Sequence, residues 1–306
     1  MSEWDAVIIG GGPAGLTAGL YLARGNWRTA LLEKENVGGY IMNVEMIENY
    51  PGFAAGVPGS QLAMEMKDQA VQYGLQIEHG EVTGLRASPD QKWVTCADGT
   101  TYNAKAVIIA GGSVPKKLGV PGEDELRGRG VINCAFCDGG EFADRVVAVC
   151  GGGDAGITEA LYLTRIASRV IVIEALPNLT ATGVLRDRAR SEPKLEVRCG
   201  QRVTRIVGQE QVEGVELVGA DKPETLAVDG VLVHVGVDPA TDYLAGVVPL
   251  DGQRQVIVNG WMETAVPGVF AAGDIRSGSP RQVSAAVGDG ATAGLAAQRY
   301  LQKLAK

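Results

Sequence analysis

Two cysteines separated by two residues are the clearest chemical signal in this chain. Cys134 and Cys137 stand in the stretch CAFCDGG, and Asp138 follows the second cysteine directly. Two intervening residues allow the sulfurs to bond, and such sites often lower the pKa of a thiol, which favours a redox dithiol. Asp138 is placed to carry protons to and from the pair, or to cap the turn that follows, and one carboxylate can do both.

A zinc site and a pair of buried structural cysteines are the alternatives for this motif. Zinc would need a second pair of ligands, and the chain offers only isolated cysteines and two histidines elsewhere. We therefore expect no metal. We interpret Cys96, Cys150 and Cys199 as structural, and His234, which alternates within an apolar strand, as a packed core residue.

A glycine turn near the N-terminus predicts a nucleotide site. Gly10, Gly12 and Gly15 follow the apolar run at 5–9, a helix-like stretch continues to about residue 25, and a second apolar run ends at Glu33. Gly12 lets the backbone approach a pyrophosphate, Gly15 allows close packing of helix on strand, and the helix N-terminus faces the anion. The carboxylate of Glu33 would accept a hydrogen bond from a ribose hydroxyl.

The same arrangement recurs later in the chain. Gly151, Gly153 and Gly156 follow a second apolar run, and a further run ends at Glu174. The spacing from first glycine to acid is 23 residues in both copies, and residues 10–24 and 151–165 share ten identities in 15 positions. Two nucleotide sites in one chain suggest electrons passing between two bound cofactors.

The elements around these motifs predict an α/β fold with two Rossmann-like, three-layer ββα nucleotide-binding domains, one inserted in the other. Apolar strands are expected at 107–112, 231–239 and 268–274, a linker at 114–123, and a long helix over the last 25 or so residues. Alternating runs near 76–97 and 196–228 suggest small hairpin layers. The first domain would comprise 1–113 plus 245–306, and the second 114–244.

Composition excludes several classes of protein. The net charge of −8 argues against nucleic-acid binding, because phosphate contact requires clustered lysine and arginine. No uninterrupted apolar stretch reaches 18 residues, so no membrane span is expected, and the N-terminus lacks the basic start of a signal peptide. Five cysteines are too few and too scattered for a secreted disulfide scaffold, which places the protein in a reducing cytoplasm.

Taken together, the motifs make the chain similar to the low-molecular-weight thioredoxin reductases over nearly its whole length. The matching pieces stand in family order: GGGPAG (10–15), ENYPGF (48–53), KLGVPGE (117–123), CAFCDG (134–139), GGGDAG (151–156), GVFAAGD (268–274) and RQV (281–283). The resemblance implies a homodimeric flavoprotein with FAD in the first domain. The second, nucleotide-binding-like domain would carry the dithiol and rotate between a pose that brings it to FAD and one that exposes it.

The resemblance also assigns roles to individual residues. Cys137 would face the flavin, and Cys134 would attack the disulfide of a protein substrate, plausibly a thioredoxin-like partner. Further contacts with FAD would come from outside the first glycine turn, from Gly39, Tyr40, Asn49, Asp274, Arg281, Gln282 and Val283.

Three departures from the family pattern make this an atypical member. Residues 175–181 contain no cation, whereas the family usually has a His-Arg-Arg cluster there that grips the 2′-phosphate of NADPH. Gly156 replaces a common alanine, which makes the second turn resemble the FAD-binding one, and Tyr40 stands where a glutamine is usual. A carboxylate at the ribose repels a 2′-phosphate, so the second site is expected to take NADH or a second FAD rather than NADPH.

The sequence therefore predicts a flavin-dependent disulfide oxidoreductase that passes electrons through FAD to the Cys134–Cys137 pair and on to a protein disulfide. An electron-carrier protein that reduces a single FAD is a further option for the donor. The alternative function is a flavin-bound redox sensor or docking protein without steady turnover, since the usual grip on NADPH is missing.

Overall fold

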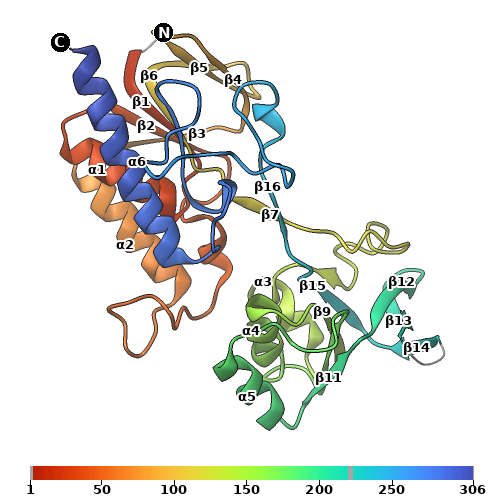
Figure 1. Ribbon diagram of the computed structural model, residues 1–306. Helices are drawn as coiled ribbons and strands as arrows, with labels where there is room; N and C mark the ends of the chain where they lie inside the picture. Colours follow the sequence, from red (N-terminus) through yellow and green to blue (C-terminus); the bar gives the residue numbers. More distant parts are fainter. Residues whose placement is uncertain (1–2, 220–222, 306) are drawn as a thin grey trace. The chain divides into compact units, whose positions relative to one another are not determined.

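A computed structural model describes residues 3–219 and 223–305, and the chain divides into two compact units (Figure 1). Unit 1 comprises Met1–Val114 and Asp238–Lys306, and unit 2 comprises Pro115–Val237. Unit 2 is thus inserted into unit 1 along the sequence. The chain returns to unit 1 at Asp238, ahead of the expected position 245.

The sheet of unit 1 has the strand order β3-β2-β1-β6-β5-β4, with β17 also paired to β6. Its strands are β1 (Glu3–Ile9), β2 (Thr29–Glu33), β3 (Gln76–His79), β4 (Val82–Ala87), β5 (Lys92–Cys96), β6 (Thr101–Ile109) and β17 (Val269–Ala271). The strands β3, β2, β1, β6 and β17 pair in parallel, whereas β4 and β5 form an antiparallel hairpin on β6. The central strands β1 and β6 both end in the apolar run AVII, because both faces of this part of the sheet are covered.

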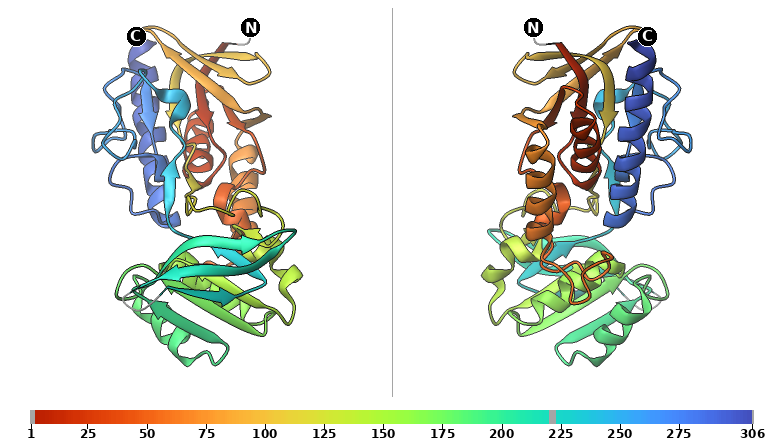
Figure 2. Two further views of the ribbon diagram at one scale, coloured as in Figure 1. Left: turned by 90° about the vertical axis from the view of Figure 1, so that its right-hand side faces the viewer. Right: turned by 90° about the vertical axis from the view of Figure 1, so that its left-hand side faces the viewer.

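Helices cover one face of that sheet. They are α1 (Pro13–Arg24), α2 (Gly59–Gln72) and α6 (Val283–Leu304), and short 3-10 turns lie at η1 (Gly39–Asn43), η3 (Asp242–Leu244) and η4 (Gly273–Ile275). Helix α6 lies alongside α1 (Figure 2). Alternate strand residues such as Ile8 and Leu31 pack under these helices, while Val7 and Leu32 pack on the opposite face with residues of the β4–β5 hairpin.

Unit 2 repeats this layering on a smaller scale. Its parallel sheet has the order β11-β10-β9-β15-β8, formed by β8 (Val131–Ile132), β9 (Val146–Cys150), β10 (Arg169–Glu174), β11 (Leu195–Cys199) and β15 (Gly230–Val233). One face packs against α4 (Asp154–Leu163), α5 (Gly183–Ser191) and the short α3 (Ala135–Asp138) and η2 (Gly139–Phe142). The other face packs against the antiparallel strands β12 (Arg202–Gly208), β13 (Val212–Val218) and β14 (Glu224–Ala227).

These two units are the three-layer ββα, Rossmann-like folds that the sequence predicted. The expected hairpin layers were only partly right. Residues 76–79 and 195–199 are β3 and β11, the edge strands of the two parallel sheets, and only the segments after them form antiparallel layers. The reason is that a helix precedes each of these strands and returns the chain parallel to its neighbour, which a short alternating pattern does not reveal.

The two crossings between the units run side by side. They are β7 (Ser113–Pro115) and β16 (Val237–Pro239), which pair as a two-stranded ribbon. The Lys116 amide donates to the Gly236 carbonyl at 3.0 Å and the Ala240 amide donates to the Gly112 carbonyl at 3.1 Å. These two bonds make the pairing antiparallel.

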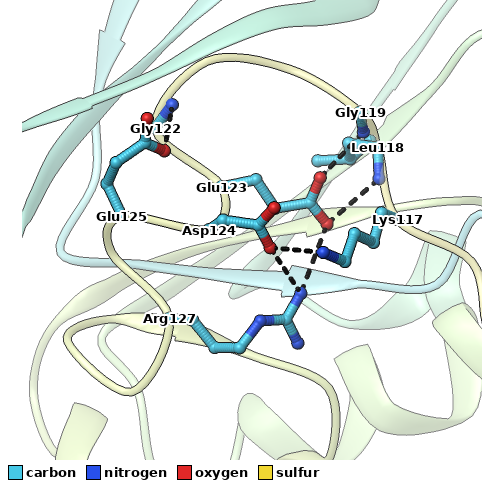
Figure 3. A network of polar contacts seen from close by, with 8 residues as sticks. All are labelled: Lys117, Leu118, Gly119, Gly122, Glu123, Asp124, Glu125 and Arg127. Atoms are coloured by element: carbon cyan, nitrogen blue, oxygen red, sulfur yellow. Dashed lines mark hydrogen bonds and ion pairs between the residues drawn. The ribbon is translucent and has the colours of Figure 1, made fainter.

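A polar network orders the loop that follows β7 (Figure 3). The Glu123 side chain is only 2% exposed, and its carboxylate accepts hydrogen bonds from the amides of Leu118 (3.1 Å) and Gly119 (2.8 Å). Asp124 forms a 2.6 Å ion pair with Lys117. The two amide donors offset the cost of burying the Glu123 carboxylate, and they fix the backbone where the chain enters unit 2.

No helix within the described ranges combines the length and the apolar character needed to cross a lipid bilayer.

Candidate functional site

The first glycine turn lies at the carboxyl end of β1 and leads into α1. Gly10 has φ +106°, and a Cβ there would lie 2.3 Å from the Ala110 carbonyl oxygen. A Cβ on Gly15 would lie 1.9 Å from the Gly10 carbonyl oxygen, so only glycine lets α1 approach the strand this closely. A Cβ on Gly12 would meet nothing within 4 Å. The space in front of the first amides of α1 is therefore open to a phosphate group.

Glu33 closes this turn at the end of β2. One carboxylate oxygen accepts the Gly11 amide at 2.7 Å and the other accepts the Glu35 amide at 2.9 Å. These bonds hold the carboxylate beside the turn. Its remaining lone pairs can accept hydrogen bonds from ribose hydroxyls.

The remaining first-site residues come from three separate segments of unit 1. Gly39 and Tyr40 begin η1, where a Cβ on Gly39 would lie 3.0 Å from Gly12 Cα and the Tyr40 side chain is 46% exposed. Asn49 Nδ2 donates to Gln282 Oε1 at 2.9 Å, which joins the loop before α2 to the residue that precedes α6. The structure thus brings η1 against the glycine turn and Asn49 against Gln282.

Asp274 lies in η4, close to the segment that carries Arg281. Burial raises the pKa of the Asp274 carboxyl, while the Arg281 charge works in the opposite direction. Arg281 itself has φ +56°, an uncommon left-handed conformation for a residue with a side chain. Val283 begins α6 and packs beside a small core cluster that includes Ile41 of η1. Asp274, Arg281 and η1 therefore belong to adjoining parts of unit 1.

The second glycine turn has the same geometry in unit 2. Gly151 has φ +117°, and a Cβ there would lie 2.1 Å from the His234 carbonyl oxygen. A Cβ on Gly156 would lie 2.1 Å from the Gly151 carbonyl oxygen, which repeats the relation of Gly15 to Gly10. The nearest atom to a Cβ on Gly153 would be Thr180 Oγ1 at 3.5 Å. The second turn thus presents the first amides of α4 in the way that the first presents those of α1.

Glu174 closes the second turn as Glu33 closes the first. Its carboxylate accepts the Gly152 amide at 2.6 Å and the Leu176 amide at 2.8 Å, and the residue is 8% exposed. The amides of Thr180 and Ala181 donate to the Gly152 carbonyl at 3.0 and 3.1 Å, so the segment after Glu174 folds back over the turn. That segment, residues 175–182, contains no lysine, arginine or histidine.

Cys134 and Cys137 form a disulfide in unit 2, with their Cα atoms 5.4 Å apart. Cys134 is the N-cap of α3, where its sulfur accepts the Cys137 amide at 3.0 Å. Burial, and after it the negative charge of Glu141, raises the pKa of Asp138. Asp138 is thus adjacent to the disulfide in sequence and disposed to hold a proton to a higher pH than an ordinary aspartate.

Sequence reasoning missed one residue at the disulfide. Glu159, on α4, accepts the Ala135 amide at 2.6 Å, and its other oxygen lies 3.0 Å from His234 Nε2. His234 is buried, as its interpretation as a core residue requires, but it also carries this polar contact. The only available signal was an acid on the helix of a nucleotide turn, and nothing in the sequence links that acid to residue 135.

The other three cysteines are free. Cys96 and Cys150 are buried, and burial, followed by the negative charge of Glu123, raises the pKa of Cys150 to about 12. Burial is also the main cause of the raised pKa values of Cys96 and Cys199. Raised pKa values disfavour thiolates, so these three cysteines are poor nucleophiles. No group of three His, Cys, Asp or Glu side chains suited to a metal ion occurs within residues 3–219 and 223–305.

Comparison with known proteins agrees with this geometry. The model of the pyridine nucleotide-disulphide oxidoreductase family matches residues 4–290. A thioredoxin reductase of Listeria monocytogenes is 40% identical over 98% of this chain and 95% of its own length. A bifunctional thioredoxin reductase/thioredoxin of Mycobacterium leprae is 38% identical over 97% of this chain and 66% of its own length. The crystal structure of Lactococcus lactis thioredoxin reductase superposes with a TM-score of 0.96 at 36% identity, covering 98% of this chain and 99% of that one.

Proposed function

The chain belongs to the pyridine nucleotide-disulphide oxidoreductase family as a flavin-dependent, thioredoxin reductase-like disulfide oxidoreductase, and on this basis we propose a route for its electrons. They enter through FAD bound by unit 1, reduce the Cys134–Cys137 disulfide of unit 2, and pass to the disulfide of a thioredoxin-like protein. The observation that carries the proposal is the disulfide itself, held at the start of α3 in a unit that also bears a nucleotide turn.

The residues of unit 1 fit FAD. Gly10 and Gly15 allow a turn that side chains would block, Gly12 leaves room for the pyrophosphate, and Glu33 offers lone pairs to the ribose. Bound there, FAD would supply the electron pair that reduces the disulfide. The remaining contacts are assigned to Gly39, Tyr40, Asn49, Asp274, Arg281, Gln282 and Val283.

In the dithiol state, Cys134 attacks one sulfur of the partner's disulfide, which forms a mixed disulfide and releases the other partner sulfur as a thiol. Cys137 then attacks Cys134, which restores the Cys134–Cys137 disulfide and releases the second partner thiol. Two electrons and two protons pass to the partner in total. Asp138 carries protons to and from the pair, a role supported by its raised pKa.

The second glycine turn is assigned to a nucleotide with a free 2′-hydroxyl, either NADH or a second FAD. The supporting observation is Glu174, a buried carboxylate held toward the turn by two amides, with no cation in residues 175–182. A 2′-phosphate at that position would meet a like charge and no counter-charge from this segment, which disfavours NADPH.

An electron-carrier protein is the third possible donor, and it would leave one FAD as the only flavin. The same lack of cations favours the second candidate function, a flavin-bound redox sensor that cycles its dithiol without steady turnover.

We further propose that the protein acts as a homodimer in the cytoplasm. Light scattering of the flavin-loaded protein tests the dimer.

Two experiments separate these possibilities. Denaturing the purified protein and counting released flavins per chain tests the second site: two flavins assign it to FAD, and one leaves NADH or a carrier protein. Mixing the flavoprotein with NADH, NADPH or a reduced ferredoxin tests the donor by the loss of flavin absorbance. Rapid bleaching, followed by reoxidation when an oxidised thioredoxin is added, supports the enzyme, whereas no bleaching by any donor supports the sensor.

Substitution of Cys134 by serine tests whether thioredoxin reduction requires this sulfur. Cys134→Ser should abolish thioredoxin reduction while flavin binding and flavin bleaching by the donor remain. Full thioredoxin reduction by this variant would refute the assignment of Cys134 as the attacking sulfur.

A further inference from the structure

Glu159 joins three parts of unit 2 at the start of the disulfide segment. It lies on α4, the helix that begins at the second glycine turn. One carboxylate oxygen accepts the amide of Ala135, the residue directly after Cys134, at 2.6 Å. The other oxygen lies 3.0 Å from Nε2 of His234, which follows β15. The carboxylate therefore stands one peptide unit from Cys134.

The contact with His234 is enclosed. The side chains of His234 and Glu159 are 7% and 13% exposed. His234 Nε2 is not aligned on the carboxylate as a hydrogen-bond donor and has no other hydrogen-bond partner, so the two polar groups are close without forming a hydrogen bond. The His234 amide donates to the Cys150 carbonyl at 2.8 Å, which fixes the residue beside the second glycine turn. A charge held in such a place is weakly screened by water.

We propose that Glu159 is a positioning residue for the Cys134–Cys137 pair: it fixes the backbone after Cys134 and its negative charge holds the pair toward the disulfide state. The polar ring of His234, which lies 3.0 Å from the other carboxylate oxygen, would compensate part of that charge whenever it carries a proton. The inference rests on the proposed redox function of the pair. It adds to that function a residue on α4 that sets how strongly the dithiol can reduce its partner.

The direction follows from charge. Reduction breaks the S–S bond, takes up two electrons and yields two thiols or, with fewer protons bound, a thiolate. A negative carboxylate nearby disfavours the thiolate, as would the other acids close to the pair, Asp138 and Glu141. Disfavouring the reduced form makes the dithiol a stronger electron donor. The charge of Glu159 thus favours electron transfer onward to the partner.

Glu159→Gln is the direct test, because glutamine keeps an oxygen that can accept the Ala135 amide and removes only the charge. The flavin-loaded full chain is equilibrated without oxygen in defined mixtures of reduced and oxidised dithiothreitol. The thiols are then trapped with an alkylating agent, and mass spectrometry of the peptide that contains residues 134 and 137 gives the reduced fraction. The equilibrium constant for reduction should rise up to about tenfold in the variant, which corresponds to about 30 mV.

Glu210→Gln is the matched control. It makes the same charge change at an exposed position between β12 and β13, and it should leave the equilibrium constant unchanged. A wild-type equilibrium constant in folded Glu159→Gln would overturn the proposal.

His234→Val supplies a test of opposite sign. It removes a ring that can carry a positive charge, so at a pH where the wild-type ring is protonated the equilibrium should move toward the disulfide. The same substitution should have no further effect when Glu159 is already glutamine, because His234 acts through that carboxylate. Shifts of the same sign, or full additivity in the double variant, would overturn the proposal. If Glu159→Gln does not fold, an unchanged equilibrium in His234→Val alone does so.

These outcomes are distinct from failure of the proposed function. The dithiothreitol equilibrium requires neither donor nor partner, so it reports on Glu159 even in a protein without turnover. The proposed function fails instead if the wild-type pair accepts no electrons from the reduced flavin. A merely structural role for Glu159 or His234 would lower the melting temperature of both variants without moving the equilibrium in opposite directions.

Discussion

At the scale of the residue, Glu33 and Glu174 each use one side-chain carboxylate to hold a glycine turn in place. Each carboxylate accepts two backbone amides. One comes from the second glycine of its turn, Gly11 or Gly152, and the other from the residue two positions after the glutamate, Glu35 or Leu176. These bonds leave further lone pairs on each carboxylate that can accept hydrogen bonds from hydroxyl groups. A carboxylate already satisfied by amides has no need of a cation, which agrees with the cation-free segment after Glu174.

Glu174→Ala should destabilise unit 2. It leaves the buried Gly152 amide and the Leu176 amide without acceptors, at a cost of about 1–3 kcal/mol. Urea unfolding followed by circular dichroism measures the change, with the exposed Glu210→Ala as a control that should stay near the wild-type value. Wild-type stability in Glu174→Ala would show that water satisfies both amides.

Asp138→Asn should lower the rate of disulfide exchange by about a hundredfold, the usual contribution of a positioned proton carrier. The raised pKa means that the protonated carboxyl persists to a higher pH than in ordinary aspartic acid. A step that needs this proton slows as pH rises through that pKa. The wild-type pH profile of thioredoxin reduction should therefore show a descending limb that the variant lacks. An identical limb in both proteins would assign it to another group.

The residues of the glycine turns and the disulfide could be identified from the sequence because each belongs to a short, local pattern. Glu159 and His234 could not. They stand on α4 and after β15. The packing of α3 on α4 brings Glu159 to residue 135, and His234 contacts Glu159 from the end of β15. The sequence favoured the interpretation of His234 as a packed core residue, because the strand residues around it are apolar. The hydrophobic periodicity of a strand carries no information on a single polar contact.

At the scale of the element, the packing of α6 on α1 positions the first site. Gly290 lies where a Cβ would be 2.2 Å from the Ala14 carbonyl oxygen, and Ala14 belongs to the first glycine turn. Gly294 likewise faces Ala18, with a Cβ 3.0 Å from its carbonyl oxygen. Two glycines one helical turn apart thus let the long C-terminal helix α6 pack closely on α1, the helix that begins at the first glycine turn.

Gly290→Ala should therefore separate α6 from α1, at a cost of about 1–3 kcal/mol, and should speed release of the flavin. Gly288→Ala is the matched control on the same helix, because it is exposed and a Cβ there meets nothing within 4 Å. That control should gain up to about 1 kcal/mol from helix propensity. Thermal unfolding and the rate of flavin loss in dilute protein measure both. Equal behaviour of the two variants would contradict the packing argument.

Element types were predicted well where a long apolar run met a glycine turn, as for β1, α1, β9 and α4. They were predicted poorly for β3 and β11, whose short alternating sequences suit an edge strand of a parallel sheet and a hairpin equally. Whether each segment becomes a parallel edge strand or part of a hairpin depends on two tertiary features. They are the packing of the helix that precedes the strand and the sheet edge that the strand joins.

At the scale of the whole molecule, each unit has hydrophobic clusters of its own, so denaturation should occur in two transitions. All four tryptophans, Trp4, Trp27, Trp93 and Trp261, lie in unit 1. Tryptophan emission should therefore follow unit 1 alone, while far-ultraviolet circular dichroism follows both. Gly290→Ala should move the transition seen by emission, and Glu174→Ala only the other one. A single coincident transition by both probes would show that the units unfold together.

The paired crossings also make the molecule divisible. Because β7 and β16 pair with each other, the ends left by removing residues 115–237 lie on two neighbouring strands. A two-residue Asn-Gly turn could join these strands into a hairpin and leave unit 1 as a chain of less than two-thirds the original length. An unrelated redox domain could be inserted at the same junction in place of unit 2.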